Sequence, residues 1–166
     1  HTSPDARWIE EHPADWYVRD SLGNTIVQYD WTDIAKLDYG NTDMRAAMAA
    51  AMRFWLNRGI YLLAEGEAPA LHDGAFDASY AWELHHLLND IAQGRKSAAD
   101  LRAYVARDAA AMPREAFRLM FTSNHDENSW AGTEFERMGD AARVMAFLTF
   151  TLPNGQPLVY TGQEMG

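Results

Sequence analysis

The chain contains the run Ile60-Tyr61-Leu62-Leu63-Ala64-Glu65-Gly66-Glu67, in which a continuously apolar stretch ends abruptly in charge. An apolar stretch of this length is typical of a strand that is buried on both faces in a parallel sheet. A second strand is predicted over residues 117–122, and it leads directly into Ser123-Asn124-His125-Asp126. Both strands are therefore expected to end in polar side chains.

Helices are predicted between and around these strands. Apolar residues recur at helical spacing over residues 42–58, 84–91, 98–109 and 134–152. Capping-box patterns begin at Ser97 and Thr133 and predict the starts of the last two helices. Further strands are expected over residues 75–82 and 158–160. The alternation of strand and helix predicts an α/β fold with a parallel sheet.

The N-terminal part of the sequence, residues 1–40, has a different character. It is rich in aromatic and turn residues, and residues 16–18 and 25–29 flank the turn sequence Asp20-Ser21-Leu22-Gly23-Asn24. This pattern predicts a hairpin on a long loop. We therefore expect an N-terminal segment over residues 1–40 and the α/β portion over residues 41–166.

Composition excludes several classes of function. The formal net charge of −10 disfavours nucleic acid as a partner, because such a chain repels phosphate backbones. The chain has no cysteine, so disulfides and thiolate chemistry are excluded. No stretch of the sequence has the length and apolar character of a membrane span, and no signal-peptide pattern is present. The first residue is His1, which we interpret as processing or truncation.

Two acids are predicted to meet at one edge of the sheet. Glu65 and Asp126 each follow a predicted strand, and the carboxyl ends of parallel strands are where α/β enzymes place their sites. Glycoside hydrolysis needs paired carboxyl groups, one to protonate the leaving oxygen and one to stabilise the oxocarbenium-like centre. On spacing alone, a solvated strand-end charge is the better interpretation of Glu65, and a turn stabilised by Asn and Asp side chains is the alternative for Asp126. Glu67 competes with Glu65 for the same role.

Three motifs resemble glycoside hydrolase family thirteen, the α-amylase family, and they occur in that family's order. The run from Phe121 to Trp130 resembles its Asn-His-Asp region, residues 62–67 resemble the end of its fifth strand, and residues 157–164 resemble its eighth strand. Residues 1–5 resemble the region after its third strand, and residues 35–41 the end of its inserted loop domain. The resemblance covers essentially the whole chain.

The resemblance implies the roles of individual residues. Glu65 would be the general acid/base and Asp126 the carboxylate that supports the distorted sugar, while His125 and His1 would hydrogen-bond the substrate. Asn124 adds a further hydrogen-bonding group, and Trp130 an aromatic surface that suits a sugar ring. The implied substrate is an α-1,4-glucan such as starch or a maltooligosaccharide.

The family's nucleophile is missing from the sequence. The family has a fourth strand with an Arg-x-Asp motif before the glutamate strand, but here Gly59-Ile60 runs directly into Tyr61. The resemblance therefore implies a truncated, partial (half) TIM (β/α)8 barrel that retains strands five to eight, with a remnant of the inserted loop domain at residues 1–40. Such a sheet has two unpaired edges, which predicts a homo-oligomer.

Three interpretations of activity follow. The chain is a weak hydrolase, or a catalytically impaired remnant that binds α-glucans, or part of a protein that carries the segment after all. An intact mass of 18.7 kDa would exclude the third.

The resemblance requires no cofactor. It allows calcium, with Asp38 as one surviving ligand, while residue spacing disfavours zinc. It favours an extracellular or periplasmic location, which the residues themselves do not decide.

Overall fold

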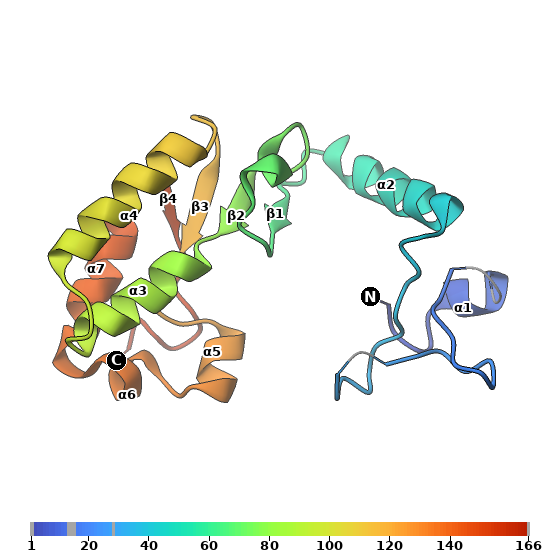
Figure 1. Ribbon diagram of the computed structural model, residues 1–166, viewed down its shortest axis with the longest axis horizontal. Helices are drawn as coiled ribbons and strands as arrows, with labels where there is room; N and C mark the ends of the chain where they lie inside the picture. Colours follow the sequence, from blue (N-terminus) through green and yellow to red (C-terminus); the bar gives the residue numbers. More distant parts are fainter. Residues whose placement is uncertain (1, 13–15, 28, 166) are drawn as a thin grey trace. The chain divides into compact units, whose positions relative to one another are not determined.

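The computed structural model describes residues 2–12, 16–27 and 29–165, and it divides into two compact units, His1–Ile60 and Tyr61–Gly166 (Figure 1). The sequence placed the boundary near residue 40, so helix α2 (Thr42–Leu56) was expected to belong to the α/β portion. The structure groups it with the N-terminal unit because its buried Met44 packs against Trp16, Tyr17, Ala35 and Leu37.

The N-terminal unit contains short helix α1 (Arg7–Glu11), helix α2 and isolated antiparallel bridges. Among the described residues, the predicted hairpin is a tight turn with a bridge between Arg19 and Thr25 and without extended strands. Asp20 stabilises this turn, since its Oδ1 accepts hydrogen bonds from the backbone N–H groups of Leu22 and Asn24, each at 2.9 Å. Asn41 caps α2, with its side chain accepting from two backbone N–H groups of the first turn.

The C-terminal unit is an α/β structure with a four-stranded parallel sheet in the order β1-β2-β3-β4 (Figure 1). The strands are β1 (Leu63–Ala64), β2 (Ala78–Tyr80), β3 (Phe117–Met120) and β4 (Gly155–Pro157). The helices are η1 (Pro69–His72), α3 (Trp82–Ala92), α4 (Ala98–Ala111), α5 (His125–Trp130), α6 (Glu134–Met138), η2 (Gly139–Ala141) and α7 (Ala142–Thr151). The predicted α/β class and parallel sheet are confirmed.

One face of the sheet carries the main hydrophobic core. Leu84 and Leu88 of α3, Tyr104 of α4 and Met145 of α7 pack with Met120 of β3. Side chains alternate along β3, so that Arg118 and Met120 are buried while Phe117 is 48% exposed. Both predicted capping boxes are present, at Ser97 before α4 and at Thr133 before α6.

Three sequence predictions need correction. The strand predicted over residues 60–64 is shorter and is exposed at Tyr61 and Leu63, because β1 is an edge strand with one neighbour, β2. The last strand begins at Gly155 rather than at Leu158; a Cβ at Gly155 would lie only 2.7 Å from Met120 Sδ, so glycine permits the close pairing with β3. The helix predicted over residues 134–152 is interrupted at Gly139, whose φ is +56°.

Within the part of the chain that the structure describes, no helix has both the length and the apolar character needed to cross a membrane.

Candidate active site

The loop after β1 carries two acids, Glu65 and Glu67, which have different environments. Glu65 follows Ala64 directly and is exposed. Glu67 is engaged in the fold, because its Oε1 lies 2.6 Å from Nη2 of Arg118 and its Oε2 accepts the backbone N–H of Glu83 at 3.0 Å. Of the two, Glu65 is therefore the acid whose carboxyl group is accessible to a substrate.

Arg118 explains why Glu67 is held so firmly. It is 1% exposed, lies on β3, and donates to Ser79 Oγ of β2 at 2.5 Å. Its Nε also lies 3.4 Å from Asp108 Oδ1 of α4. A buried guanidinium requires such partners, since an unpaired buried charge is costly. The ion pair with Glu67 therefore fixes the loop that carries Glu65.

The Asn-His-Asp run was predicted as a strand-end loop, and its last two residues begin helix α5 instead. Asn124, which is 1% exposed, is the N-cap, and its Oδ1 accepts the backbone N–H of Glu127 at 2.8 Å. The Asn124 side chain therefore stabilises the start of α5 by capping it. His125 and Asp126 form the first turn, with side chains 70% and 49% exposed and His125 Nε2 lying 3.4 Å from Asp126 Oδ1.

Tyr80 is a site residue that the sequence analysis missed. It is the last residue of β2, the strand between β1 and β3, and pairs in register with Leu119. Burial raises the pKa of its hydroxyl, the negative charge of Glu65 raises it further, Asn124 opposes the shift, and Asp126 raises it again. The Tyr80 phenol is therefore within electrostatic reach of both predicted catalytic carboxylates.

Aromatic side chains surround Tyr80. Its ring stacks on Trp82 with centroids 5.2 Å apart, and Phe121 meets it edge-on at 5.4 Å. Trp130, at the end of α5, is 79% exposed, which leaves its indole available to a ligand. The sequence signal for Tyr80 and Trp82 is their position at the carboxyl end of the strand predicted over residues 75–82.

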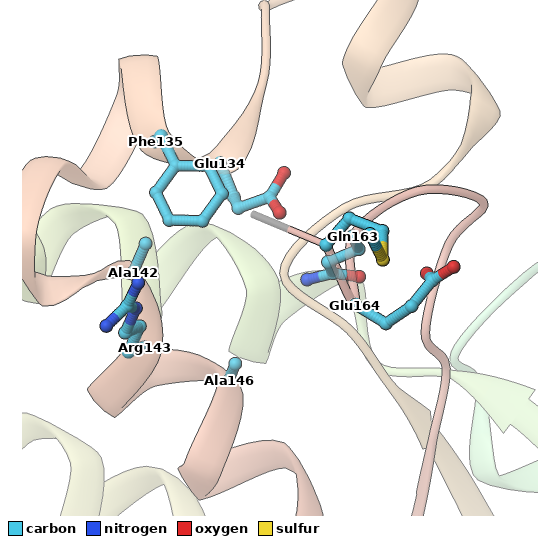
Figure 2. Close-up of a pocket in the computed structure, with 8 residues that line it drawn as sticks. Glu134, Phe135, Ala142, Arg143, Ala146, Gln163 and Glu164 are labelled. Atoms are coloured by element: carbon cyan, nitrogen blue, oxygen red, sulfur yellow. The ribbon is translucent and has the colours of Figure 1, made fainter.

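Residues 157–164, which resemble the family's eighth strand, contact the segment after β3 through Gln163. Gln163 Nε2 donates to Thr122 Oγ1 at 2.5 Å, and Gln163 Oε1 accepts the backbone N–H of Tyr160 at 3.0 Å. Gln163 also borders a hollow of about 300 Å³ together with Glu134, Arg143 and Glu164 (Figure 2). Neither Glu65 nor Asp126 lines this hollow, so it is distinct from the predicted catalytic pair.

The predicted metal ligand Asp38 has a local role. Its Oδ1 accepts the backbone N–H of Gly40 at 2.8 Å, which forms the turn before α2. Among the described residues, no three or more His, Asp or Glu side chains gather closely enough to hold a metal ion. His1, the remaining predicted substrate contact, lies outside the described residues.

The chain was also compared with known proteins. No protein-family model matches the sequence, and no curated protein matches it either. Solved structures do match: an α-amylase from Lactobacillus plantarum at 24% identity and a TM-score of 0.76, covering 99% of this chain and 49% of that one. A noncanonic maltogenic α-amylase from Thermotoga neapolitana matches at 22% identity and a TM-score of 0.74, covering 98% and 44%.

An α-amylase from H. orenii matches at 18% identity and a TM-score of 0.65, with 99% of this chain and 48% of that chain covered. The chain thus spans about half the length of the structures that it matches. It therefore has the fold of roughly half of an α-amylase chain.

Proposed function

We propose that this chain is a glycoside hydrolase of the α-amylase type that acts on α-1,4-glucans. Glu65 serves as the general acid/base, and Asp126 stabilises the positive charge that develops on the sugar. The observation that carries the proposal is the sheet order, which puts Glu65 after β1 and Asp126 after β3, on the two neighbours of β2. The pKa of Tyr80, the last residue of β2, is raised by burial and by the negative charges of both acids, which supports the same grouping.

The environment of each group suits its proposed role. Glu65 is exposed at the tip of β1, so it can deliver a proton to a glycosidic oxygen and recover one from water. Asp126 is half-exposed on the first turn of α5, next to the exposed imidazole of His125. His125 would hydrogen-bond a sugar hydroxyl, Trp130 would stack against a sugar ring, and buried Asn124 would hold the turn that presents them.

The proposed architecture is a half-barrel equivalent to strands five to eight of the family. Four parallel strands in sequential order, helices between them and a match to half of each α-amylase chain support it. The proposed chemistry needs no cofactor.

The stereochemistry of the product depends on which group replaces the missing nucleophile, a second carboxylate or a water molecule. A retaining reaction needs a second carboxylate about 5 Å from Glu65, whereas a separation of about 6.5–9.5 Å admits water and inverts the product. The anomeric configuration of the first product, measured by proton NMR, distinguishes these routes.

The proposal is tested by reducing-sugar release from maltoheptaose. Glu65→Gln and Asp126→Asn each should lower kcat about 10²–10⁴-fold, the range expected when a general acid or a charge-stabilising group is lost. Glu83→Gln is the matched control, since Glu83 forms an exposed ion pair with Arg107. Activity that is unchanged in both site variants would identify a contaminating amylase and end the assignment.

A second candidate function is glucan binding without hydrolysis. It is favoured by the direct connection from Gly59-Ile60 to Tyr61, which leaves no Arg-x-Asp motif. Loss of a nucleophile commonly costs orders of magnitude in rate. This candidate predicts heat release on titration with maltoheptaose that Trp130→Ala weakens, while no reducing sugar appears.

A further inference from the structure

Glu127 follows the proposed carboxylate Asp126 directly, and the two side chains have different environments. The Glu127 side chain is 19% exposed and that of Asp126 is 49% exposed. Successive residues of a helix point about 100° apart, so one residue of such a pair can turn inward while the next faces solvent. Anything that fixes Glu127 therefore also fixes the direction of Asp126.

Glu127 turns toward a buried histidine. His85 of α3 is 1% exposed, and its Nε2 lies 3.0 Å from Glu127 Oε2. Its ring stacks on Phe121 with centroids 4.6 Å apart, and its Nδ1 lies 3.4 Å from the Phe121 carbonyl oxygen. Asn89 Nδ2 lies 3.2 Å from the same Nε2, so this ring nitrogen faces both the Glu127 carboxylate and the Asn89 amide.

Arg137 completes the cluster. Its Nη2 donates to the Thr122 carbonyl oxygen at 2.8 Å, and its Nε donates to the Gly132 carbonyl oxygen at 3.1 Å. Its Nη1 donates to Asn89 Oδ1 at 3.0 Å and lies 3.9 Å from Glu127 Oε2. Arg137 thus joins the end of β3, the loop after α5 and helix α3.

The charges within the cluster balance. Burial lowers the pKa of His85, and the positive charge of Arg137 lowers it too, against the raising effect of the Glu127 contact. His85 is therefore neutral at pH 7, and the negative charge of Glu127 is offset by Arg137. Besides Glu127 and Arg137, the groups around His85 are Asn89, the Phe121 carbonyl, and the rings of His86 and Trp82 on its own helix.

We propose that His85, Glu127 and Arg137 form an anchoring cluster whose role is to position Asp126 for catalysis. This inference rests on the hydrolase function proposed above. Helix α5 has only six residues, so its own hydrogen bonds cannot hold its orientation. Its first turn is fixed by the Asn124 cap on one side and by the Glu127 carboxylate on the other. The three cluster members are positioning residues, since their side chains are largely buried and contact one another.

Glu127→Gln in the full chain is the first test, because it keeps the shape of the side chain and removes its charge. We expect it to shift the backbone amide resonances of His125 and Asp126 and to lower kcat about 10–100-fold with little change in KM, since a small misplacement has a cost of that order. Glu83→Gln, on the exposed pair with Arg107, should change neither.

The outcomes separate this inference from the proposed function. If Glu127→Gln leaves both the two resonances and kcat unchanged while Glu65→Gln inactivates, the anchoring role is wrong and the hydrolase stands. If the wild-type chain has no activity, the resonances still test the anchor. Rescue of kcat by Glu127→Asp, which restores the charge, is expected for positioning through charge.

A second measurement uses the wild-type protein alone. Nitrogen NMR of the imidazoles should show that His85 is neutral at pH 7, with a pKa below the ordinary value of about 6.5. A protonated His85 at pH 7, or a His85 pKa at or above the ordinary value, would overturn the proposed arrangement.

Discussion

Glu67 Oε1 lies 2.6 Å from Nη2 of Arg118, and this contact divides the roles of two acids that are separated by a single glycine. Arg118 lies on the interior strand β3, and its side chain is only 2% exposed. Glu67 thus neutralises a buried cation, while Glu65 is left exposed at the tip of β1. One acid of the Glu-Gly-Glu run maintains the fold and the other is available for chemistry.

The two acids should therefore respond differently to the same substitution. Glu67→Gln is expected to lower the free energy of unfolding by about 1–3 kcal/mol, because it leaves a buried guanidinium with only the more distant Asp108 carboxylate as a charged partner. Glu65→Gln should change stability by less than about 0.5 kcal/mol, as is usual for an exposed side chain. Urea denaturation monitored by circular dichroism measures both. Equal losses for the two variants would contradict this division.

Alkaline pH should destabilise the C-terminal unit through Tyr104. Burial raises the pKa of its hydroxyl, and the negative charge of Asp108 raises it further. The folded chain then resists an ionisation that the unfolded chain undergoes near pH 10, so stability is complete below that pH and is lost above it. The loss amounts to at most about 1.4 kcal/mol per pH unit for one group.

The effect of Tyr104 can be isolated by substitution. Urea denaturation between pH 8 and pH 11 should show a shallower decline for Tyr104→Phe than for the wild type. Tyr39→Phe is the matched control, because Tyr39 is 58% exposed. Identical pH dependence for Tyr104→Phe and the wild type would rule out a contribution from Tyr104.

Self-association stays a prediction. In the described sheet, β1 and β4 each pair with one neighbour, so two strand edges are open. Exposed edges of this kind promote pairing with another chain, and Phe117 adds an apolar side chain that is 48% exposed. Light scattering at micromolar concentration should give at least twice the chain mass of 18.7 kDa. A monomer under these conditions would refute the prediction.

Much of the fold could be predicted from local signals. The capping boxes at Ser97 and Thr133 fix where two helices begin, and the structure confirms both. The position of β4 could not be predicted, because it depends on how closely Gly155 approaches Met120 of the neighbouring strand. The exposure of the Tyr61 side chain could not be predicted either, since an apolar run does not reveal whether its strand lies at an edge of the sheet.

The candidate site was only partly predictable. Sequence order placed Glu65 and Asp126 at strand ends, but it did not predict that His125 and Asp126 begin a helix. That helix depends on the cap at Asn124 and on the contact of Glu127 with His85, which belongs to a helix much earlier in the chain. The boundary between the two compact units falls between Ile60 and Tyr61. This is the point of the sequence at which a segment resembling the family's fourth strand is missing.

The titration of the Tyr80 hydroxyl tests most directly whether Glu65 and Asp126 act at one place, and it does not require activity. Carbon NMR of labelled tyrosine would follow Tyr80 in the wild type, Glu65→Gln and Asp126→Asn, with Glu83→Gln as control. Negative charges raise the pKa of a phenol, so each site substitution should lower the pKa of Tyr80, and the control should leave it unchanged. A Tyr80 pKa that is indifferent to either substitution would contradict the shared site.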